Sequence, residues 1–502
     1  MREGTAGASA STDGDKTYES AVKDLNNLQT NYQIMEQIRA SGGRLNENSI
    51  PEFEAFLEKV GHQTPDLDRL NVIHITGTKG KGSTCAFVAS ILSQLSLAGS
   101  TQRKLKIGVF TSPHLIEVRE RIQIDGSPIS ADSFAKYFYE TYNALRSPTP
   151  PLRKVAPESP DMPMYFRFLT LMAYHVFLRE NVDVAVVEVG VGGQYDSTNV
   201  IRSPVVCGIA SLGLDHQTTL GSTIEQIAWH KAGIIKNAVP AYTVSQDDGA
   251  LAVIRERAAE RSAPLHIVDP AKLLGPSVEL GIPGSHQQTN AALAVSLCRE
   301  WVRRTNICAS VSSDALDLAI DAGLRTASWP GRSQTFVSPR NAKLTWHVDG
   351  AHTIESMAAC AQWFAQIPID TSNGCHRVLL FNAAHSRNAP ELLTTLVKNT
   401  VVGQDWFCEA VFCPNISSRS DSVNFTVHND PNLGSQKDAA TVWQQLTELP
   451  ETSTTVLPTI TDAVAHIEAK YGTADDGVPT HVLVTGSLHL VGGVLDAAKG
   501  SI

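Results

Sequence analysis

The sequence lacks several features that mark common protein classes. Among its 502 residues, no apolar run approaches the length of a membrane span. Its eight cysteines include no C-x-x-C pair, and only Cys408 and Cys413 have loosely metal-like spacing, so we expect buried, reduced thiols. Basic residues are the minority, 41 Lys and Arg against 51 Asp and Glu, and the net charge of −10 disfavours a nucleic-acid surface.

The ends and the length of the chain set the expected organisation. The first residues, MREGTAGASASTDGDK, lack the apolar core of a secretory signal and carry acidic residues, so we expect a cytoplasmic protein, with a mitochondrial form left open. The length predicts two domains. We expect a disordered tail over 1–17, an ATP-binding domain over 18–327 with an exposed Pro-rich insertion at 146–163, and a C-terminal domain over 328–502.

Apolar periodicity predicts alternating strands and helices. Helical spacing runs from Tyr18 to Arg39, and a further helix is expected from Ser83 to Ala98. Near-continuous apolar runs indicate buried parallel strands; they are NVIHIT, LKIGVF, DVAVVEV and PVVCGIAS in the first part, and LTWHVDG, HRVLLFN, EAVFC and HVLVTGS in the second. The predicted fold is α/β: a doubly wound, mostly parallel sheet with a P-loop-like site, plus a smaller C-terminal Rossmann-like α/β domain.

The stretch HITGTKGKGSTCAF lies between a predicted strand and a predicted helix. It departs from the standard phosphate-binding pattern, which requires Gly where Ile75 stands and Ser or Thr where Gly82 stands. A glycine turn at a helix N-terminus nevertheless presents backbone N–H groups to an anion, and Lys81 can reach the terminal phosphates. The alternative is an ordinary strand-to-helix turn with an exposed Lys. Because strand and helix fall where phosphate binding needs them, we favour a nucleotide site.

Three further residues follow buried strands. They are Ser112 in VFTSPHL, Glu188 in VVEVGVGG and His216 in LDHQTTLG. The C-terminal ends of parallel strands line the ligand crevice of such sheets, and oxygen ligands with one imidazole suit Mg²⁺ carrying a triphosphate. Taken singly, each has a plainer interpretation: a turn-forming Ser, a Glu in a structural salt bridge and a surface His.

Other charged residues stand near the predicted crevice. WHKAGIIK places Lys231 and Lys236 on a predicted helix, where either could neutralise a phosphate or carboxylate; for Lys236 we favour plain surface charge. In the second domain, WPGR supplies Arg332 and DGAH supplies Asp349, which could contact phosphate and ribose or adenine respectively.

Together the motifs resemble one family. GTKGKGST, TSPHL, RERI, VVEVGVGG, LDHQTTLGSTIEQIAWHKAGIIK, WPGR and DGAH occur in the order seen in the folylpolyglutamate synthases of the Mur ligase superfamily. The glycine loop has that family's own spelling. The resemblance implies a central domain of the Mur ligase type and an ATP-dependent ligase that joins L-glutamate to the γ-carboxylate of tetrahydrofolate through an acyl phosphate.

The resemblance also implies residue roles. The phosphate loop would comprise Thr78, Lys79, Gly80, Lys81, Gly82 and Ser83, with Arg332 and Asp349 as nucleotide contacts. The Mg²⁺ ligands would be Ser112, Glu188 and His216, and the catalytic residues Lys81, His216 and Lys231, the last matching a lysine that is carbamylated in some members. The expected ligands are ATP, Mg²⁺, a reduced folate and L-glutamate, with a monovalent cation such as K⁺ as a further candidate. We expect a monomer that binds neither nucleic acid nor membranes.

One segment departs from the family. Where N-x-x-x-x-R-D is expected, NAAHSRN stands at Asn382–Asn388, so affinity for glutamate is where this chain could deviate. Dihydrofolate synthase is the nearest alternative, and a ligase with another carboxylate acceptor is a second. An inactive scaffold would have lost Lys81, Glu188 or His216, and all three are present. A dehydrogenase fails because no G-x-G-x-x-G turn is followed by a ribose-binding acid.

Overall fold

The structure is a computed structural model that describes most of the chain. It covers residues 16–28, 46–96, 103–275, 278–308, 311–368, 374–383, 387–400, 407–417, 432–447, 450, 453–472 and 478–499. Residues 1–15 of the predicted tail over 1–17, and the predicted helical stretch beyond residue 28, therefore lie outside the described residues, whereas Thr17 caps the first helix. No described helix combines the length and the apolar composition that crossing a membrane requires.

The first sheet has eight strands in the order β4-β3-β2-β5-β1-β6-β7-β8. Six of them run parallel, and β3 and β4 form an antiparallel edge. β1 lies between β5 and β6, so the glycine loop that follows it emerges at the middle of the sheet. The strands are β1 (Ile73–Thr76), β2 (Ile107–Phe110), β3 (Ile122–Ile124), β4 (Ser127–Pro128), β5 (Val184–Glu188), β6 (Val206–Ile209), β7 (Ala241–Val244) and β8 (Leu265–Val268).

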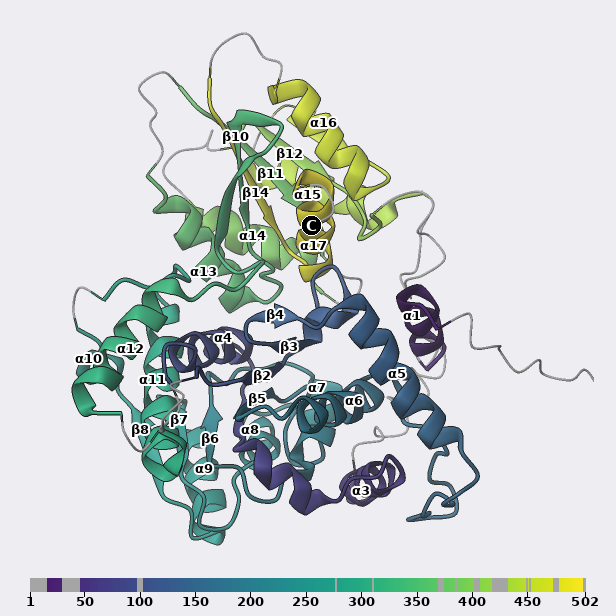
Figure 1. Ribbon diagram of the computed structural model, residues 1–502. Coiled ribbons are helices and arrows are strands. Elements are labelled where there is room, and N and C mark those ends of the chain that lie inside the picture. Colours follow the sequence, from purple (N-terminus) through teal and green to yellow (C-terminus); the bar gives the residue numbers. More distant parts are fainter. Residues whose placement is uncertain are drawn as a thin grey trace, which may run out of the picture.

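Helices cover both faces of this sheet (Figure 1). Strand β5 shows why: Val184 and Val186 join the core beneath α4 and α11, while Ala185 and Val187 join the core beneath α5 and α6. A strand with apolar side chains on both faces must be covered on both. The helices are α1 (Tyr18–Asn26), α3 (Ser49–Lys59), α4 (Lys81–Leu92), α5 (Ala131–Arg146), α6 (Tyr165–Glu180), α7 (Gln217–Leu220), α8 (Ile224–Ala232), α9 (Asp248–Glu260), α10 (Pro270–Leu273), α11 (Gln287–Arg304) and α12 (Ser313–Thr326), with short 3₁₀ turns at Thr64–Leu70, Val118–Arg121, Ser197–Val200 and Asn306–Cys308.

The second sheet has six strands in the order β13-β12-β11-β14-β10-β9, of which only β9 is antiparallel to its neighbour. Val482 and Val484 of β14 face the core under α16 and α17, and Leu483 faces the core under α13, α14 and α15. The strands are β9 (Gln334–Ser338), β10 (Asn341–Val348), β11 (His376–Phe381), β12 (Glu409–Phe412), β13 (Thr454–Val456) and β14 (Thr480–Thr485), and the helices are α13 (Ile354–Ala365), α14 (Ala389–Thr400), α15 (Gly434–Thr447), α16 (Ile460–Gly472) and α17 (Leu488–Lys499).

The predicted fold class is confirmed, with two local corrections. Helix α4 begins at Lys81 rather than Ser83 and ends at Leu92 rather than Ala98, because the chain turns at Ser93 and Ser96 pairs with Lys104. Helix α8 ends at Ala232, so Lys236 follows the helix instead of belonging to it.

The Pro-rich segment 146–163 joins α5 to α6. Most of it is exposed, yet it is tied to α3: the buried Lys59 donates to the carbonyl of Ser147 (2.6 Å), and Arg153 pairs with Glu58 (3.0 Å).

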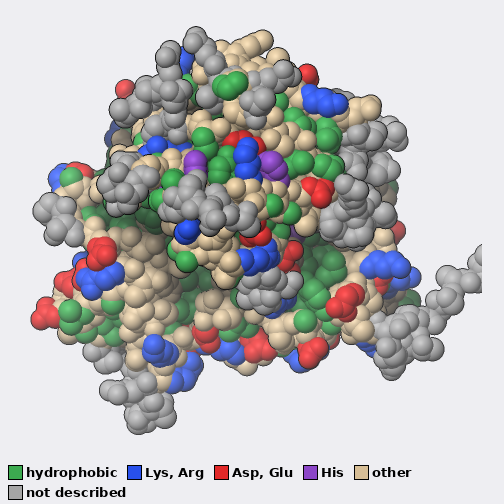
Figure 2. Space-filling model, turned by 90° about the horizontal axis from the view of Figure 1, so that it is seen from above, with side chains coloured by type: hydrophobic (Ala, Val, Ile, Leu, Met, Phe, Trp, Pro, Cys, Tyr) green, Lys and Arg blue, Asp and Glu red, His purple; other side chains and the backbone are tan. Residues whose placement is uncertain are grey.

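Figure 2, which views the molecule from the side of the second sheet, shows acidic and basic side chains interspersed over that face.

Candidate active site

The glycine loop connects β1 to α4 at the centre of the first sheet. Gly80 has a left-handed backbone (φ +84°), and a Cβ there would overlap the amide of Asn290 on α11. The N–H groups of Thr78 and Lys79 both donate to the carbonyl of Ser211, at 2.9 and 3.0 Å. The first amides of a helix have no partner within it, so the amides at the start of α4 are the ones left to meet an anion.

Two lysine side chains converge at one carbonyl of this loop. Lys81 donates to the carbonyl of Gly77 at 3.0 Å, and Lys231 of α8 donates to the same oxygen at 2.8 Å. Lys231 is buried, and burial, followed by the neighbouring Lys81, lowers the pKa of its amine well below the ordinary value. The structure thus brings together two of the predicted catalytic residues, 150 positions apart in the sequence.

Glu188 lies at the end of β5, next to the loop. The residue is 4% exposed, and its carboxylate accepts a hydrogen bond from the backbone N–H of Ser112 at 2.9 Å. Burial raises the pKa of Glu188, while Lys81, Arg332 and Arg121 act in the opposite direction. We call Lys81, Lys231 and Glu188 the inner cluster; Lys81 is half-buried, whereas Lys231 and Glu188 are buried and have little solvent to stabilise a charge.

The predicted metal ligands fit Mg²⁺ in part. Ser112 and Glu188 lie together, and Mg²⁺ needs only one or two carboxylates because waters and phosphates complete its shell. His216 is exposed, in a left-handed conformation just before α7, and none of its described contacts joins it to Glu188. In the part of the chain that the structure describes, no three His, Cys, Asp or Glu residues gather into a metal-binding group.

A second group of charges surrounds Asp215 at the mouth of the loop. Lys79 pairs with Asp215 (3.4 Å) and approaches His352 Nε2 (3.4 Å), and Arg387 pairs with the other oxygen of Asp215 (3.3 Å). Burial alone would raise the pKa of Asp215, but Lys79, His216 and Arg387 hold it well below the ordinary value. We call Lys79, Asp215, His352 and Arg387 the outer cluster; its last two members follow strands β10 and β11 of the second sheet.

The two remaining predicted nucleotide contacts, Arg332 and Asp349, belong to the second domain. Asp349, at the end of β10, accepts hydrogen bonds from the backbone N–H (2.7 Å) and hydroxyl (3.2 Å) of Ser333. Arg332 is close enough to Glu188 to act on its carboxylate electrostatically. The WPGR turn thus places Arg332 within electrostatic reach of Glu188, and Ser333, the next residue, binds Asp349.

Sequence reasoning missed a contribution from α11. Gln287 lies within hydrogen-bond distance of the Ser83 hydroxyl (3.4 Å), and Asn290 donates to Gln287 (2.9 Å) while its amide faces Gly80. The available signal was SHQQTN, an unbroken polar run at the start of an apolar helix.

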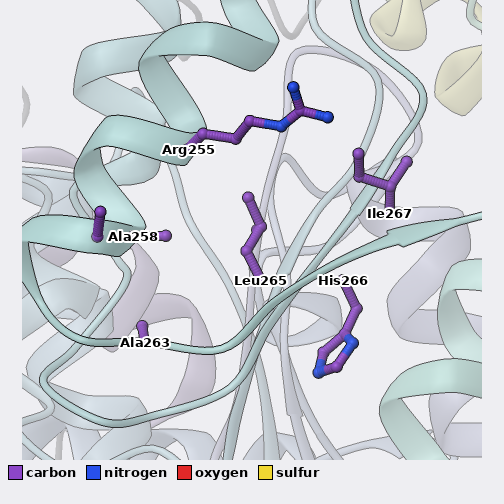
Figure 3. Close-up of a pocket in the computed structure, with 7 residues that line it drawn as sticks. Arg255, Ala258, Ala263, Leu265, His266 and Ile267 are labelled. Atoms are coloured by element: carbon purple, nitrogen blue, oxygen red, sulfur yellow. The ribbon is translucent and has the colours of Figure 1, made fainter.

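A surface cavity of about 480 Å³ lies elsewhere, between α9 and the edge strand β8 (Figure 3). Small apolar side chains such as Ala258 and Ala263 form much of its wall, and His266 stacks on Tyr242 (ring centroids 4.7 Å apart). No phosphate-binding turn or carboxylate lines it. The glycine loop, with its two clusters, is therefore the candidate active site.

Comparison with known proteins identifies similar sequences. A mitochondrial folylpolyglutamate synthase of Bos taurus is 40% identical over an alignment of 582 positions that covers 100% of this chain and 96% of the relative. A folylpolyglutamate synthase of Neurospora crassa is 39% identical, covering 96% of this chain and 91% of the relative. No protein-family model matches the chain.

Solved structures share the fold. Mycobacterium tuberculosis folylpolyglutamate synthase complexed with ADP and AMPPCP superposes with a TM-score of 0.69 at 24% identity, covering 95% of this chain and 98% of that one. Escherichia coli FolC in complex with DHPP and ADP gives a TM-score of 0.67 at 21% identity, covering 97% and 98%.

Fold and site together define an ATP-dependent ligase of the Mur type, with the glycine loop on one α/β unit and a second α/β unit closing over it. Because curated relatives are about 40% identical over essentially the whole chain, the chain belongs to the folylpolyglutamate synthase family. The resemblance seen in the motifs is confirmed.

Proposed function

We propose that this protein adds L-glutamate to the γ-carboxylate of tetrahydrofolate and of its polyglutamates, at the expense of ATP. One observation carries the proposal. Lys81 and Lys231 meet at the carbonyl of Gly77 beside the buried Glu188, so cationic and anionic groups are fixed in place before any ligand arrives. Phosphoryl transfer requires this kind of positioning and charge neutralisation more than it requires covalent help from the protein.

The chemistry runs in two steps. An oxygen of the folate γ-carboxylate attacks the γ-phosphorus of ATP, giving an acyl phosphate and ADP. The amine of L-glutamate then attacks the carbonyl carbon and loses a proton, and the tetrahedral intermediate expels phosphate to leave the amide. Lys81 stabilises charge on the transferring group, while Arg332 and Asp349 contact the nucleotide from the second domain. Closure of that domain keeps water from the acyl phosphate.

Mg²⁺ is the divalent cation we assign to the site, held by Ser112, Glu188 and His216. When bound, it supplies charge neutralisation at the phosphate oxygens. The N–H of Ser112 on Glu188 fixes the carboxylate in one orientation, which supports the assignment for these two residues. His216 is the weakest member of the set because it is exposed. A monovalent cation such as K⁺ is proposed as an additional requirement.

Lys231 is proposed as a carbamylated residue. Only a neutral amine reacts with CO₂, and burial favours the neutral form of Lys231. A carbamate would place a negative charge beside Lys81, where a protonated Lys231 would instead repel it. Incubation with ¹³C-bicarbonate should give a carbamate carbon signal in NMR that is absent from Lys231→Ala.

The decisive experiment measures phosphate release from ATP with Mg²⁺ and L-glutamate, offering tetrahydrofolate and dihydropteroate separately and weighing the products by mass spectrometry. Turnover with tetrahydrofolate, with mass rising by successive glutamyl units, is expected. Turnover with dihydropteroate alone would make the protein a dihydrofolate synthase instead. ATP binding without turnover of either substrate would favour another acceptor, and the altered Asn382–Asn388 segment is where we would look for its cause.

The proposal also covers the domain bounds, the oligomeric state and the cellular location. We assign residues 18–327 to the ATP-binding domain and 328–502 to the C-terminal domain, a division that the separate apolar cores of the two sheets support. We propose that the enzyme is a monomer, which light scattering during gel filtration would test. We also propose a cytoplasmic location, to be compared with the mitochondrial one that the names of some relatives carry.

A further inference from the structure

Within the first domain, the carboxylate of Glu120 holds the loop that follows Ser112. Glu120 accepts three consecutive backbone N–H groups, those of Leu115 (2.8 Å), Ile116 (3.0 Å) and Glu117 (2.7 Å). Hydrogen bonds to an ionised acceptor are the strong ones. The segment 115–117 therefore forms a closed turn three residues beyond Ser112.

The other side of this turn is held by the second domain. Leu115 and Ile116 follow a strand of the first sheet, yet they pack against the core beneath α16 and α17. The side chain of Leu115 lies against Gly331. The side chain of Val491 on α17 lies against the same glycine.

At Gly492, helix α17 also approaches the backbone of the loop. A Cβ added at Gly492 would overlap the carbonyl oxygen of Leu115, so any residue other than glycine would force the loop and the helix apart. The adjacent Gly493 points the other way, and a Cβ there would meet the side chain of Ile460 inside the second domain. Helix α17 thus presents one glycine to the first domain and one to its own core.

We propose that α17 positions the Ser112 loop, so that the seating of the second domain sets the geometry of Ser112 against Glu188. Leu115, Glu120 and Gly492 are positioning residues in this scheme: none touches the reacting atoms, and each acts through the loop. Only two residues separate Ser112 from Leu115, and the backbone N–H of Ser112 is bound to Glu188, so a displacement of the turn is passed on to Ser112. The consequence for Mg²⁺ rests on the proposed function; the anchoring itself does not.

The two adjacent glycines provide a matched test. Gly492→Ala and Gly493→Ala each add one methyl group to the same helix and gain similar helix propensity, about 1 kcal/mol. Hydrogen exchange of the full-length, ligand-free protein reports the amides of Leu115, Ile116 and Glu117. We expect these amides to exchange at least about tenfold faster in Gly492→Ala and at the wild-type rate in Gly493→Ala. Equal exchange at the loop in the two variants would overturn the proposal, whether or not the protein proves to be a ligase.

The functional arm measures the Mg²⁺ concentration that half-saturates ATP turnover. Gly492→Ala should raise it about tenfold while kcat at saturating Mg²⁺ stays near the wild-type value, as expected when a supporting contact rather than a ligand is lost. A faster loop with an unchanged Mg²⁺ requirement would overturn the coupling. Should Gly492→Ala fail to fold, Leu115→Ala removes the side-chain packing of the loop against the second domain without adding atoms, and the same faster exchange is expected; wild-type exchange in that variant would count against the proposal.

Discussion

The inner and outer clusters belong to one site but differ in burial and in the direction of their pKa shifts. In the inner cluster, Lys231 and Glu188 are buried, and burial shifts both pKa values toward the neutral forms. In the outer cluster, Asp215 is already paired with cations from both domains, and its pKa is lowered. The inner groups make hydrogen bonds to the backbone but no ion pair of their own among the described residues, whereas the outer charges pair with one another. We infer that the inner cluster serves chemistry and that the outer cluster serves the seating of the two domains.

The largest expected effect would come from removing an inner cation. Lys81→Ala should lower kcat for ATP-dependent ligation by at least about 100-fold, because a preorganised donor aimed at developing charge is lost. Lys79→Ala, which removes a neighbouring loop cation of the outer cluster, is the matched control and should cause a clearly smaller loss of kcat. Steady-state phosphate release measures both. Equal losses in the two variants would abolish the distinction between the clusters.

The next test removes the inner anion without changing its shape. Glu188→Gln should raise the Mg²⁺ concentration needed for half-maximal turnover by about tenfold or more, since a neutral amide is a poor ligand for a hard cation. The fold should persist, because the amide can still accept the N–H of Ser112. An unchanged Mg²⁺ titration would remove Glu188 from the metal site.

Sequence reasoning reached the inner cluster more fully than the outer one. The glycine loop and Glu188 both end predicted strands, and parallel strands bring their C-terminal ends to one edge, so the proximity of the loop to Glu188 followed from topology alone. The outer cluster joins Asp215 to Lys79, 136 positions away, and to Arg387, 172 positions away on the other sheet. Neither periodicity nor a local motif specifies which of several lysines and arginines an aspartate will meet across a domain interface.

The helix ends show the same limit on a smaller scale. Apolar periodicity continues past Leu92 in the sequence, so the pattern gave no reason to end α4 there; the turn at Ser93 and the pairing of Ser96 with Lys104 decide it. The grouping of His216 with Ser112 and Glu188, made from its position after a strand, stays a prediction: the residue is exposed, yet partial burial of its ring, Lys231 and Lys81 lower its pKa, so it lies within electrostatic reach of the inner cluster. Side-chain direction in a loop depends on contacts that the pattern does not encode.

Below the inner cluster, the buried His74 predicts a pH effect on stability. Its Nε2 lies 3.0 Å from the Thr198 hydroxyl, its Nδ1 has no partner in the described structure, and burial, assisted by Lys236, lowers its pKa to about 3. The unfolded chain takes up this proton near pH 6.5, so the free energy of unfolding is unaffected above that pH and falls as the pH drops below it. At about pH 5 the loss from His74 alone should reach about 2 kcal/mol.

Replacement of His74 by Gln isolates this contribution. Other buried histidines also titrate, so the relevant quantity is the difference between wild type and His74→Gln in urea unfolding at about pH 7.5 and about pH 5. The variant should be less stable at the higher pH and should lose less stability on acidification. Parallel losses in the two proteins would mean that the imidazole can be protonated in the folded state.

The smallest expected effect is the coupling between Asp215 and Arg387, and its salt dependence distinguishes the outer cluster from the inner one. Asp215 and Arg387 are 11% and 30% exposed, and such partly exposed pairs contribute only about 0.5–1 kcal/mol. In a double-mutant cycle with Asp215→Asn and Arg387→Gln, we expect a coupling of that size in kcat/KM for ATP, and we expect it to fall when salt rises from about 0.05 M to about 0.5 M. The effect of Glu188→Gln on the Mg²⁺ requirement should not respond to salt in this way, because Glu188 is buried. A salt-independent coupling at Asp215 would mean that the outer cluster is as shielded as the inner one, and that both belong to the chemistry.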